Sequence, residues 1–381
     1  MSGAGTLGDL PEVARLAARL CEIASPSRRE GPMADAVRAE VLALGAEVAE
    51  DDAAARIGAG CNNIVARWPG TAPGTPIAFV SHLDTVPNVA PIEVEVVDGH
   101  LTNRNAAILG GDDKAAVAAH LDAIRRIRAE GRPHAGIELV FTPCEEIGLQ
   151  GAAAFDPAML RARLGFVYDY TGRIGDVVGA APTLSEVEAV FVGRAAHAGI
   201  EPELGRSAIL AASRALARMP LGRLDAETTA NIGTVTGGTA TNVVSERCTV
   251  TAEARSIDEN RLAAQLTAML DAMTWAAAET EVDLETRVHR HFTGYRLGPG
   301  DPQVAMAFRA LDGLGLAPAM IPSGGGSDVN ALLANGFPSV NLCNAMEAVH
   351  TADERIAVSA LETMVDVTLA IVDQALDGDG G

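Results

Sequence analysis

The segment TPIAFVSHLDTVP, residues 75–87, is the stretch from which the fold of this chain can be read. Its first part, 75–83, is an apolar run that predicts a buried strand, and polar residues follow at once. Three further apolar runs predict strands: NNIVARW (62–68), IELVFTPCEE (137–146) and LGFVYDY (164–170). Helical apolar spacing occurs at 10–24, at about 29–47 and at 112–130. Strands that alternate with helices predict an α/β fold with a mainly parallel sheet.

The order of elements changes after about residue 183. The apolar spacing predicts a strand at 185–196, a helix at 207–219, strands at 231–237 and 248–256, a helix at 259–278 and a strand at 282–292. This β-α-β-β-α-β order is the split, ferredoxin-like arrangement. After the linker LGPGDP (297–302), a helix near 303–314, the strand SVNL (339–342) and a C-terminal helix resume the first pattern. We therefore expect a discontinuous domain, 1–183 and 297–381, with an inserted α+β domain at 184–296.

Composition narrows the functional class. The 381 residues are 48% hydrophobic and carry a net charge of −21, and only 3% are aromatic. Such an acidic chain repels phosphate backbones and offers few base-stacking side chains, so nucleic-acid partners are not expected. Five cysteines without a C-x-x-C pair fit a reducing compartment. The segment MSGAGTLGDLPE has no signal-peptide pattern, and no apolar run is long enough to span a membrane, so we expect a soluble cytoplasmic protein.

Polar residues cluster at the ends of the apolar runs, where open α/β sheets place their sites. His82 and Asp84 are two residues apart, so on a strand they point to the same side, and an aspartate there can orient a metal-binding imidazole. Asp112 and Asp113 directly precede a predicted helix. Taken alone, the first pair could be a turn and the second pair could be helix caps.

Three further polar positions follow later strands. Glu145 and Glu146 end an apolar run and point in different directions, so one could bind a metal while the other acts as a general base. Asp169 and His350 also follow apolar runs, where a turn or cap role is the simpler explanation. Together these residues supply two imidazoles and several carboxylates without a thiolate, which suits a catalytic zinc or manganese site.

The order H-x-D, G-x-D-D-K, E-E-x-G, D and H-T-x-x-E resembles the dinuclear metallopeptidases that include peptidase T, carboxypeptidase G, aminoacylase and the diaminopimelate desuccinylase. The likeness covers essentially the whole chain and is greatest for the peptidase T-like branch. It is carried by ILGGDDKA, EEIGLQGA, GRAAHAGIEPELG, TTANIGTVTGGTATNVVSE, EARS and GGGSDVN. The resemblance implies a metal-dependent hydrolase of amide-type C–N bonds in small substrates such as short peptides or N-acyl amino acids.

The resemblance also implies roles for single residues. Two divalent cations are expected, with zinc first and manganese or cobalt as alternatives, and Asp112 would bridge them. His82 and Asp169 would complete one cation site, and Glu146 and His350 the other. Glu145 would be the general base and Asp84 would orient His82, which leaves Asp113 a supporting or capping role.

The inserted domain would be a lid and dimerisation domain. By resemblance, His197 polarises the scissile carbonyl, either in its own chain or across a homodimer. Asn242, Arg255 and the glycines Gly324, Gly325 and Gly326 match substrate-contacting positions. From the residues alone, His197 could be a surface residue, Arg255 a surface ion-pair partner, and the glycines a flexible turn.

The chain departs from the peptidase T-like pattern at three places near the expected ligands. Asn105, Ala106 and Ala107 replace a Gly-Thr-Thr-like stretch, Tyr170 replaces a small residue, and Ala345 replaces a glycine. An aminohydrolase acting on a non-peptide C–N bond, such as an aromatic amine, therefore stays open. So does a non-catalytic binding protein on the same fold. The other histidines are expected to be structural: His100, His120, His134, His289 and His291.

Overall fold

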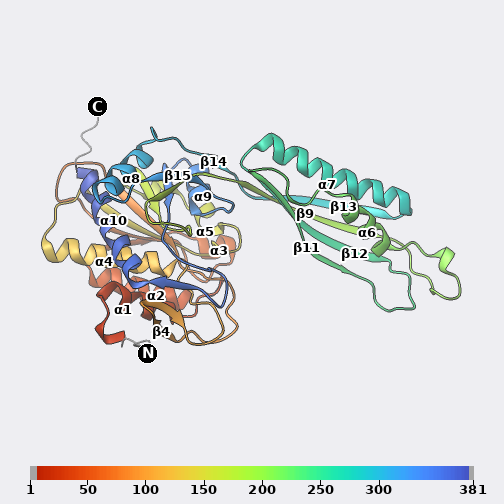
Figure 1. Ribbon diagram of the computed structural model, residues 1–381, viewed down its shortest axis with the longest axis horizontal. Helices are drawn as coiled ribbons and strands as arrows, with labels where there is room; N and C mark the ends of the chain where they lie inside the picture. Colours follow the sequence, from red (N-terminus) through yellow and green to blue (C-terminus); the bar gives the residue numbers. More distant parts are fainter. Residues whose placement is uncertain (1–6, 377–381) are drawn as a thin grey trace. The chain divides into compact units, whose positions relative to one another are not determined.

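We describe residues 7–376 of a computed structural model (Figure 1). The first six residues of the N-terminal segment MSGAGTLGDLPE, which has no signal-peptide pattern, lie outside the described residues. Within that part the chain divides into two compact units. The first unit contains residues 7–179, 297–323 and 327–376, and the second contains residues 180–296 and 324–326.

The first unit is built on a mixed sheet. Its strands are β1 (Glu47–Glu50), β2 (Ile64–Trp68), β3 (Ile77–His82), β6 (Ile137–Thr142), β7 (Leu164–Val167), β8 (Asp176–Ala181), β15 (Ala319–Pro322) and β16 (Ser339–Leu342). The sheet ends with β14 (Tyr295–Arg296), which belongs to the second unit and pairs with the last two residues of β8. The four central strands, in the order β6-β3-β7-β16, are parallel, and antiparallel strands extend the sheet on both sides. A separate small sheet pairs β4 (Val94–Val97), β5 (His100–Asn103) and β17 (Arg355–Ala357).

Helices cover the central strands. They are α1 (Glu12–Cys21), α2 (Gly31–Ala43), α3 (Ala53–Ile57), α4 (Lys114–Glu130), α5 (Gln150–Ala154), α8 (Pro302–Gly313), α9 (Asp328–Ala334) and α10 (Val358–Leu376). The main core lies between the sheet and α1, α4, α8 and α10, which pack against one another. Side chains of a strand alternate between its faces, so Phe79 enters this core while His82 belongs to the opposite face, where α9 contacts β3.

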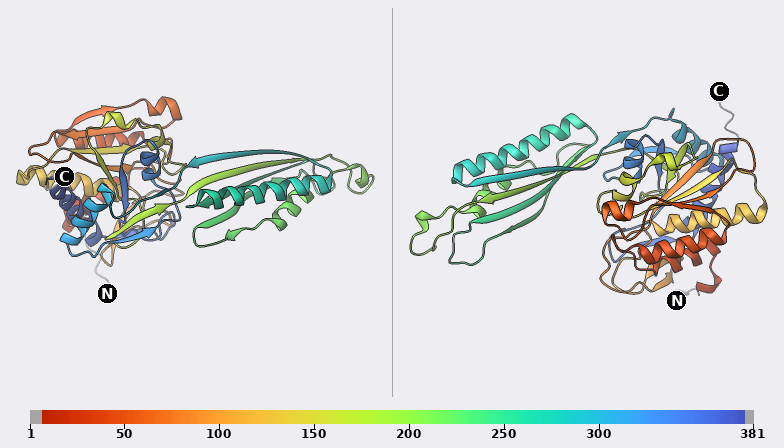
Figure 2. Two further views of the ribbon diagram at one scale, coloured as in Figure 1. Left: turned by 90° about the horizontal axis from the view of Figure 1, so that it is seen from above. Right: turned by 180° about the vertical axis from the view of Figure 1, so that it is seen from behind.

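The second unit is a single antiparallel sheet with two helices (Figure 2). Its elements are β9 (Thr183–Val192), α6 (Ala208–Arg218), β10 (Gly222–Arg223), β11 (Thr228–Gly237), β12 (Arg247–Ser256), α7 (Glu259–Thr280) and β13 (Asp283–Phe292). The strand order β10-β11-β12-β9-β13 is that of a ferredoxin-like fold, and α6 and α7 bury a second core on one sheet face. Three short 3₁₀ turns complete the described elements: Leu7–Asp9, Pro157–Met159 and Pro202–Leu204.

The predicted fold class is confirmed: α/β with a parallel sheet centre, plus an inserted ferredoxin-like α+β unit. The strand SVNL at 339–342 has the predicted bounds, and the helix expected at 112–130 begins two residues later, at Lys114. The expectation missed the antiparallel strands β1, β8 and β14 and the small three-stranded sheet. β1, β14 and the strands of the small sheet are short and partly exposed, so their apolar periodicity is weak, whereas β8 is almost entirely buried. None of the described helices is long and apolar enough to cross a membrane.

Candidate metal centre and active site

The carboxyl ends of three neighbouring parallel strands meet at one edge of the main sheet. β3 ends at His82, β6 leads through a short turn to Glu145 and Glu146, and β7 leads to Asp169. The pairings β3–β6 and β3–β7 are both parallel, which aligns these three ends. The fold therefore collects one imidazole and three carboxyl groups from segments as much as 87 residues apart in sequence, at the usual place for a site in such a sheet.

Asp112 lies between two histidines. It belongs to the loop that precedes α4, and its Oδ1 is 3.6 Å from His82 Nε2 while its Oδ2 is 3.3 Å from His350 Nε2. His350 Nε2 also lies 3.1 Å from Glu146 Oε1. Each oxygen of Asp112 thus faces a different imidazole, which is the arrangement a carboxylate needs to bridge two cations.

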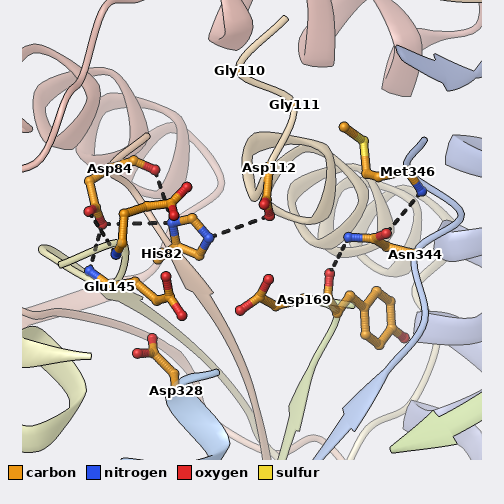
Figure 3. Close-up of polar contacts among 12 residues, drawn as sticks. His82, Asp84, Gly110, Gly111, Asp112, Glu145, Asp169, Asp328, Asn344 and Met346 are labelled. Carbon is orange, nitrogen blue, oxygen red and sulfur yellow. Dashed lines mark hydrogen bonds and ion pairs between the residues drawn. The ribbon is translucent and has the colours of Figure 1, made fainter. Parts of the chain in front are cut away.

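Two groups of side chains bring their ligand atoms within 4.8 Å of one another. One contains His82, Asp112 and Glu146, and the other contains His82, Glu145 and Asp169. Figure 3 shows the carboxyl groups of Glu145, Asp169 and Asp328 pointing toward the same space beside the His82 ring. The donor set is imidazole nitrogen and carboxylate oxygen without thiolate, which fits zinc, manganese or cobalt.

The acid–base properties of the cluster reflect dense negative charge. Burial raises the pKa of Glu145 well above its ordinary value, and the nearby carboxylates of Asp328, Glu146 and Asp84 raise it further. Burial likewise raises the pKa of Asp169, and Glu145 and Asp112 add to the shift. Hydrogen bonds with Asp112 and Glu146 raise the pKa of His350 to about 10. The negative charge that favours the protonated imidazole also favours a bound cation.

Asp84 holds both His82 and the Glu pair. Its main-chain oxygen is 2.9 Å from His82 Nδ1, whereas its carboxylate Oδ1 is 3.7 Å from that nitrogen. The carboxylate instead accepts the main-chain N–H groups of Glu145 and Glu146, at 2.9 and 3.2 Å. Asp84 therefore orients the imidazole mainly through its carbonyl group and the turn of the Glu pair through its side chain. Ser27, which the sequence did not single out, donates to the same carboxylate.

Other supporting residues were missed from the sequence. The side-chain amide of Asn341 accepts the N–H of Asp169 and donates to its carbonyl, at 2.9 and 2.8 Å. Asp328 is buried, accepts a hydrogen bond from Thr142 and points toward Glu145 (Figure 3). Burial raises the pKa of Asp328 to about 6. The available signals were a polar residue inside the apolar strand SVNL and an aspartate two residues after the run of glycines.

Asp113 is fully buried at the first turn of α4, next to the candidate ligand Asp112. Its side chain makes no hydrogen bond that caps the helix. Lys114, the last residue of the GGDDK segment, is also buried, and its Nζ donates to the carbonyl of Ile23 at 2.6 Å.

The candidate residues of the inserted domain all belong to the second unit. His197 and Asn242 lie on neighbouring exposed loops: His197 forms a β-bridge with Val243, and Ala198 N–H donates to the Asn242 carbonyl at 2.9 Å. Arg255, on β12, forms an ion pair with Glu253 through Nε and Nη2. Gly326 lies against Phe292, where a Cβ would approach the ring to 2.5 Å, whereas Gly324 has no atom within 4 Å of such a Cβ.

The three departures from the peptidase T-like pattern have clear structural settings. Ala345 adopts a left-handed backbone conformation, φ 59°, which explains why a glycine is expected there. Asn105 donates from its side chain to the Pro91 carbonyl. The main-chain oxygen of Tyr170 accepts the N–H of Asn344.

The remaining histidines belong to none of the ligand groups found among the described residues. His120 is buried and packs against the rings of Phe79 and Tyr168. Its Nδ1 shares a hydrogen bond with the Ser81 hydroxyl. His134 is also buried. His100 bonds to the Asp98 carbonyl, and His289 and His291 contact each other on β13.

Comparisons with known proteins agree with this architecture. The model of the peptidase family M20/M25/M40 matches residues 78–374. The protein YqjE of Bacillus subtilis (strain 168) is 38% identical over 356 residues, which cover 93% of this chain and 96% of YqjE.

Two solved structures are also similar. The aminopeptidase PepT from Bacillus cereus ATCC 10987 is 38% identical, with a TM-score of 0.86 over 96% of this chain and 98% of its own. A tripeptidase from Staphylococcus aureus subsp. aureus Mu50 is 34% identical, with a TM-score of 0.91 over 98% of this chain and all of its own. The similarity to both structures extends over nearly the entire chain. It therefore includes both units and the residues at the carboxyl ends of β3, β6 and β7.

Proposed function

This chain belongs to the peptidase family M20/M25/M40 and is a metal-dependent hydrolase, and we propose that it hydrolyses amide-type C–N bonds in short peptides. The observation that carries the proposal is the position of Glu145, buried beside His82 and Asp169 and held by Asp84. The names of the B. cereus aminopeptidase and the S. aureus tripeptidase support short peptides as substrates. N-acyl amino acids, which contain the same bond, are the next candidates.

Five side chains would hold two divalent cations. His82, Asp112 and Asp169 would bind one cation, and Asp112, Glu146 and His350 the other. Zinc is our first choice, and manganese and cobalt also suit this donor set. Bound cations would supply Lewis acidity to the scissile carbonyl and to the attacking water.

Glu145 would act as the general base and then as the general acid. It would accept a proton from the attacking water and return it to the leaving amine. Burial raises the pKa of Glu145, which brings its proton affinity closer to that needed at neutral pH. Because Asp84 bonds to the main chain of Glu145 rather than to its side chain, the Glu145 carboxylate remains available to the substrate.

His197 would donate a hydrogen bond to the substrate carbonyl. Its Nδ1 accepts the N–H of Gly199 at 3.2 Å, so the neutral ring carries its proton on Nε2. An exposed Nε2–H is a donor suited to the negative charge that develops on the carbonyl oxygen. We propose that His197 acts either within its own chain or across a homodimer formed through the second unit.

Arg255, Asn242 and the glycine loop Gly324–Gly326 would bind polar groups of the substrate. The guanidinium of Arg255 already pairs with Glu253, so a substrate carboxylate would have to compete for it. A guanidinium can hold one carboxylate oxygen with each nitrogen, so a bidentate exchange is feasible.

Tyr170 favours the aminohydrolase as a second candidate. A half-buried aromatic ring follows the candidate ligand Asp169 directly, where the peptidase T-like pattern has a small residue. Such a ring could pack against an aromatic amine substrate.

Membership of a peptidase family makes the third possibility, a non-catalytic binding protein, wrong.

The five cysteines are free and buried, which supports a cytoplasmic location.

A substrate panel tests the proposed function. Chain loaded with zinc, manganese or cobalt should release an N-terminal residue from dipeptides or tripeptides, and chelation should abolish this activity. Glu145→Gln serves as the matched inactive control. Turnover of an aromatic amine without turnover of any peptide would favour the aminohydrolase, and no turnover by metal-loaded chain would contradict both.

A further inference from the structure

Glu354 is buried in the segment that carries His350, but it contacts the loop of Asp112. It is 2% exposed and ends the sequence H-T-x-x-E, which begins with the candidate ligand His350. One carboxylate oxygen accepts the N–H of Gly110 at 3.0 Å. The other accepts the N–H of Gly111 at 2.9 Å and that of Asp112 at 3.2 Å.

From this geometry we propose that Glu354 is a positioning residue that fixes the carboxylate of Asp112 between His82 and His350. Three main-chain N–H groups converge on two oxygens, so the loop 110–112 cannot rotate without losing hydrogen bonds inside a buried site. The inference rests on the proposed metal site, because it explains how that site is held in shape.

The position of Glu354 in the chain strengthens this assignment. Its N–H donates to the carbonyl of Thr351 at 3.2 Å, which closes a short turn after His350. The same turn therefore presents a candidate ligand and binds the loop of the candidate bridging ligand. His350 Nε2 lies 3.3 Å from Asp112 Oδ2, so this turn connects two candidate ligands that face each other.

A carboxylate is the side chain that this loop requires. A glutamine could place its amide oxygen against Gly111 and Asp112, but its NH₂ group would then face the N–H of Gly110. Two donors facing each other lose a hydrogen bond and repel. Glu354→Gln is thus a nearly isosteric change that should disturb one side of the loop. Glu354→Asp keeps the charge but shortens the reach, so it provides a second variant if the first does not fold.

Glu138 offers a matched control in the same unit. It is also 2% exposed, and its carboxylate accepts the main-chain N–H groups of Arg161 and Ala162 at 2.9 and 2.7 Å. It pairs with Arg67 as well. These partners lie outside the candidate ligand groups. Glu138→Gln should therefore lower the thermal stability without a specific effect on metal binding.

The experiment is a Co²⁺ titration of the metal-depleted full-length chain, followed by visible absorption and by calorimetry. Glu354→Gln, or Glu354→Asp, should weaken Co²⁺ binding about 10- to 100-fold and change the visible spectrum, as expected when the support of a ligand is lost. Glu138→Gln should keep the affinity and spectrum of the parent chain. Folding is checked for every variant by circular dichroism.

The outcomes separate this inference from the proposed site. If the Glu354 variants bind Co²⁺ with the affinity and spectrum of the parent, Glu354 is only structural and the inference is wrong. If Asp112→Asn also leaves binding unchanged, or the parent chain binds no Co²⁺, the proposed metal site itself is wrong.

Discussion

Buried carboxylates of the first unit and two exposed carboxylates of the second unit are held in different ways. In the first unit, Asp84, Glu138 and Glu354 are buried, and each accepts two or three main-chain N–H groups. In the second unit, Glu253 and Glu281 are partly or largely exposed and pair with arginines. A buried carboxylate needs several hydrogen bonds to offset its lost hydration, and these bonds fix its position. An exposed ion pair contributes about 0–1 kcal/mol and can exchange partners.

This difference predicts different roles for the buried and the exposed carboxylates. Rigid, buried charge suits residues that bind metal ions and move protons, because small displacements there are costly. Exposed, exchangeable charge suits residues that meet a variable substrate. Substitutions of the buried candidate ligands and of Glu145 in the first unit should therefore strongly change metal binding or kcat. Substitutions of exposed residues in the second unit should lower kcat with little effect on stability.

The largest expected effect separates the two members of the Glu pair. Glu145→Gln should keep the metal content and lower kcat by about 10²–10⁴-fold, because the general base is lost. Glu146→Gln should lower the metal content instead. Metal analysis and steady-state kinetics on the same preparations measure both. Equal metal loss in the two variants would show that the roles of the pair are assigned wrongly.

The second prediction concerns the exposed histidine of the second unit. His197→Ala should lower kcat by about 10²–10³-fold, the typical loss for one donor to an oxyanion. The melting temperature should hardly change, because the side chain is exposed.

Mixing two inactive variants then tests the homodimer. Glu145→Gln and His197→Ala chains that exchange subunits should regain activity if His197 acts across the dimer. Absence of recovery despite proven exchange would restrict His197 to its own chain, and a monomeric protein would contradict the proposed dimer.

The third prediction measures the cost of burying a titratable group. Burial lowers the pKa of His120 from 6.5 to about 3, so the unfolded chain binds a proton below pH 6.5 that the folded chain does not. Stability should fall as the pH falls from 6.5 toward 3, by as much as about 1.4 kcal/mol per pH unit. His120→Phe removes this contribution and should flatten the pH dependence between pH 6 and 4 by about 2 kcal/mol.

Urea unfolding at several pH values provides this measurement. The difference between the parent and His120→Phe at pH 8, where His120 is neutral in both states, gives the packing effect alone. Identical pH slopes for the two proteins below pH 6 would mean that His120 can be protonated in the folded state.

The smallest expected effect compares one substitution at two sites. Ala345→Gly should stabilise the first unit by about 1 kcal/mol, because an alanine in the left-handed region is strained. Ala264→Gly, at an exposed position inside α7, should destabilise the second unit by about 1 kcal/mol through lost helix propensity. Calorimetry of both variants checks the opposite signs. Destabilisation by both would show that the Ala345 Cβ contributes more through packing than it costs in strain.

Local patterns alone specified much of this protein. Alternating apolar runs and helical spacing located the central strands, the helix after Asp112 and the β-α-β-β-α-β order of the second unit, because periodicity reports which face of an element is buried. Polar residues at the ends of the predicted elements indicated His82, Asp112, the Glu pair, Asp169 and His350, and the resemblance implied that they form one site. The structure brings these side chains close together, because the carboxyl ends of parallel strands meet at one edge, and their roles stay a proposal.

Only the tertiary structure decided how that site is supported. Glu354 binds the main chain of Asp112, which is 242 residues away, and Asp84 binds that of Glu145, 61 residues away. Asn341 holds Asp169 across 172 residues. A main-chain N–H looks the same in every residue, so no sequence pattern tells which carboxylate will accept it. That choice depends on which loops the folded sheet brings together, and it is made only when the chain has folded.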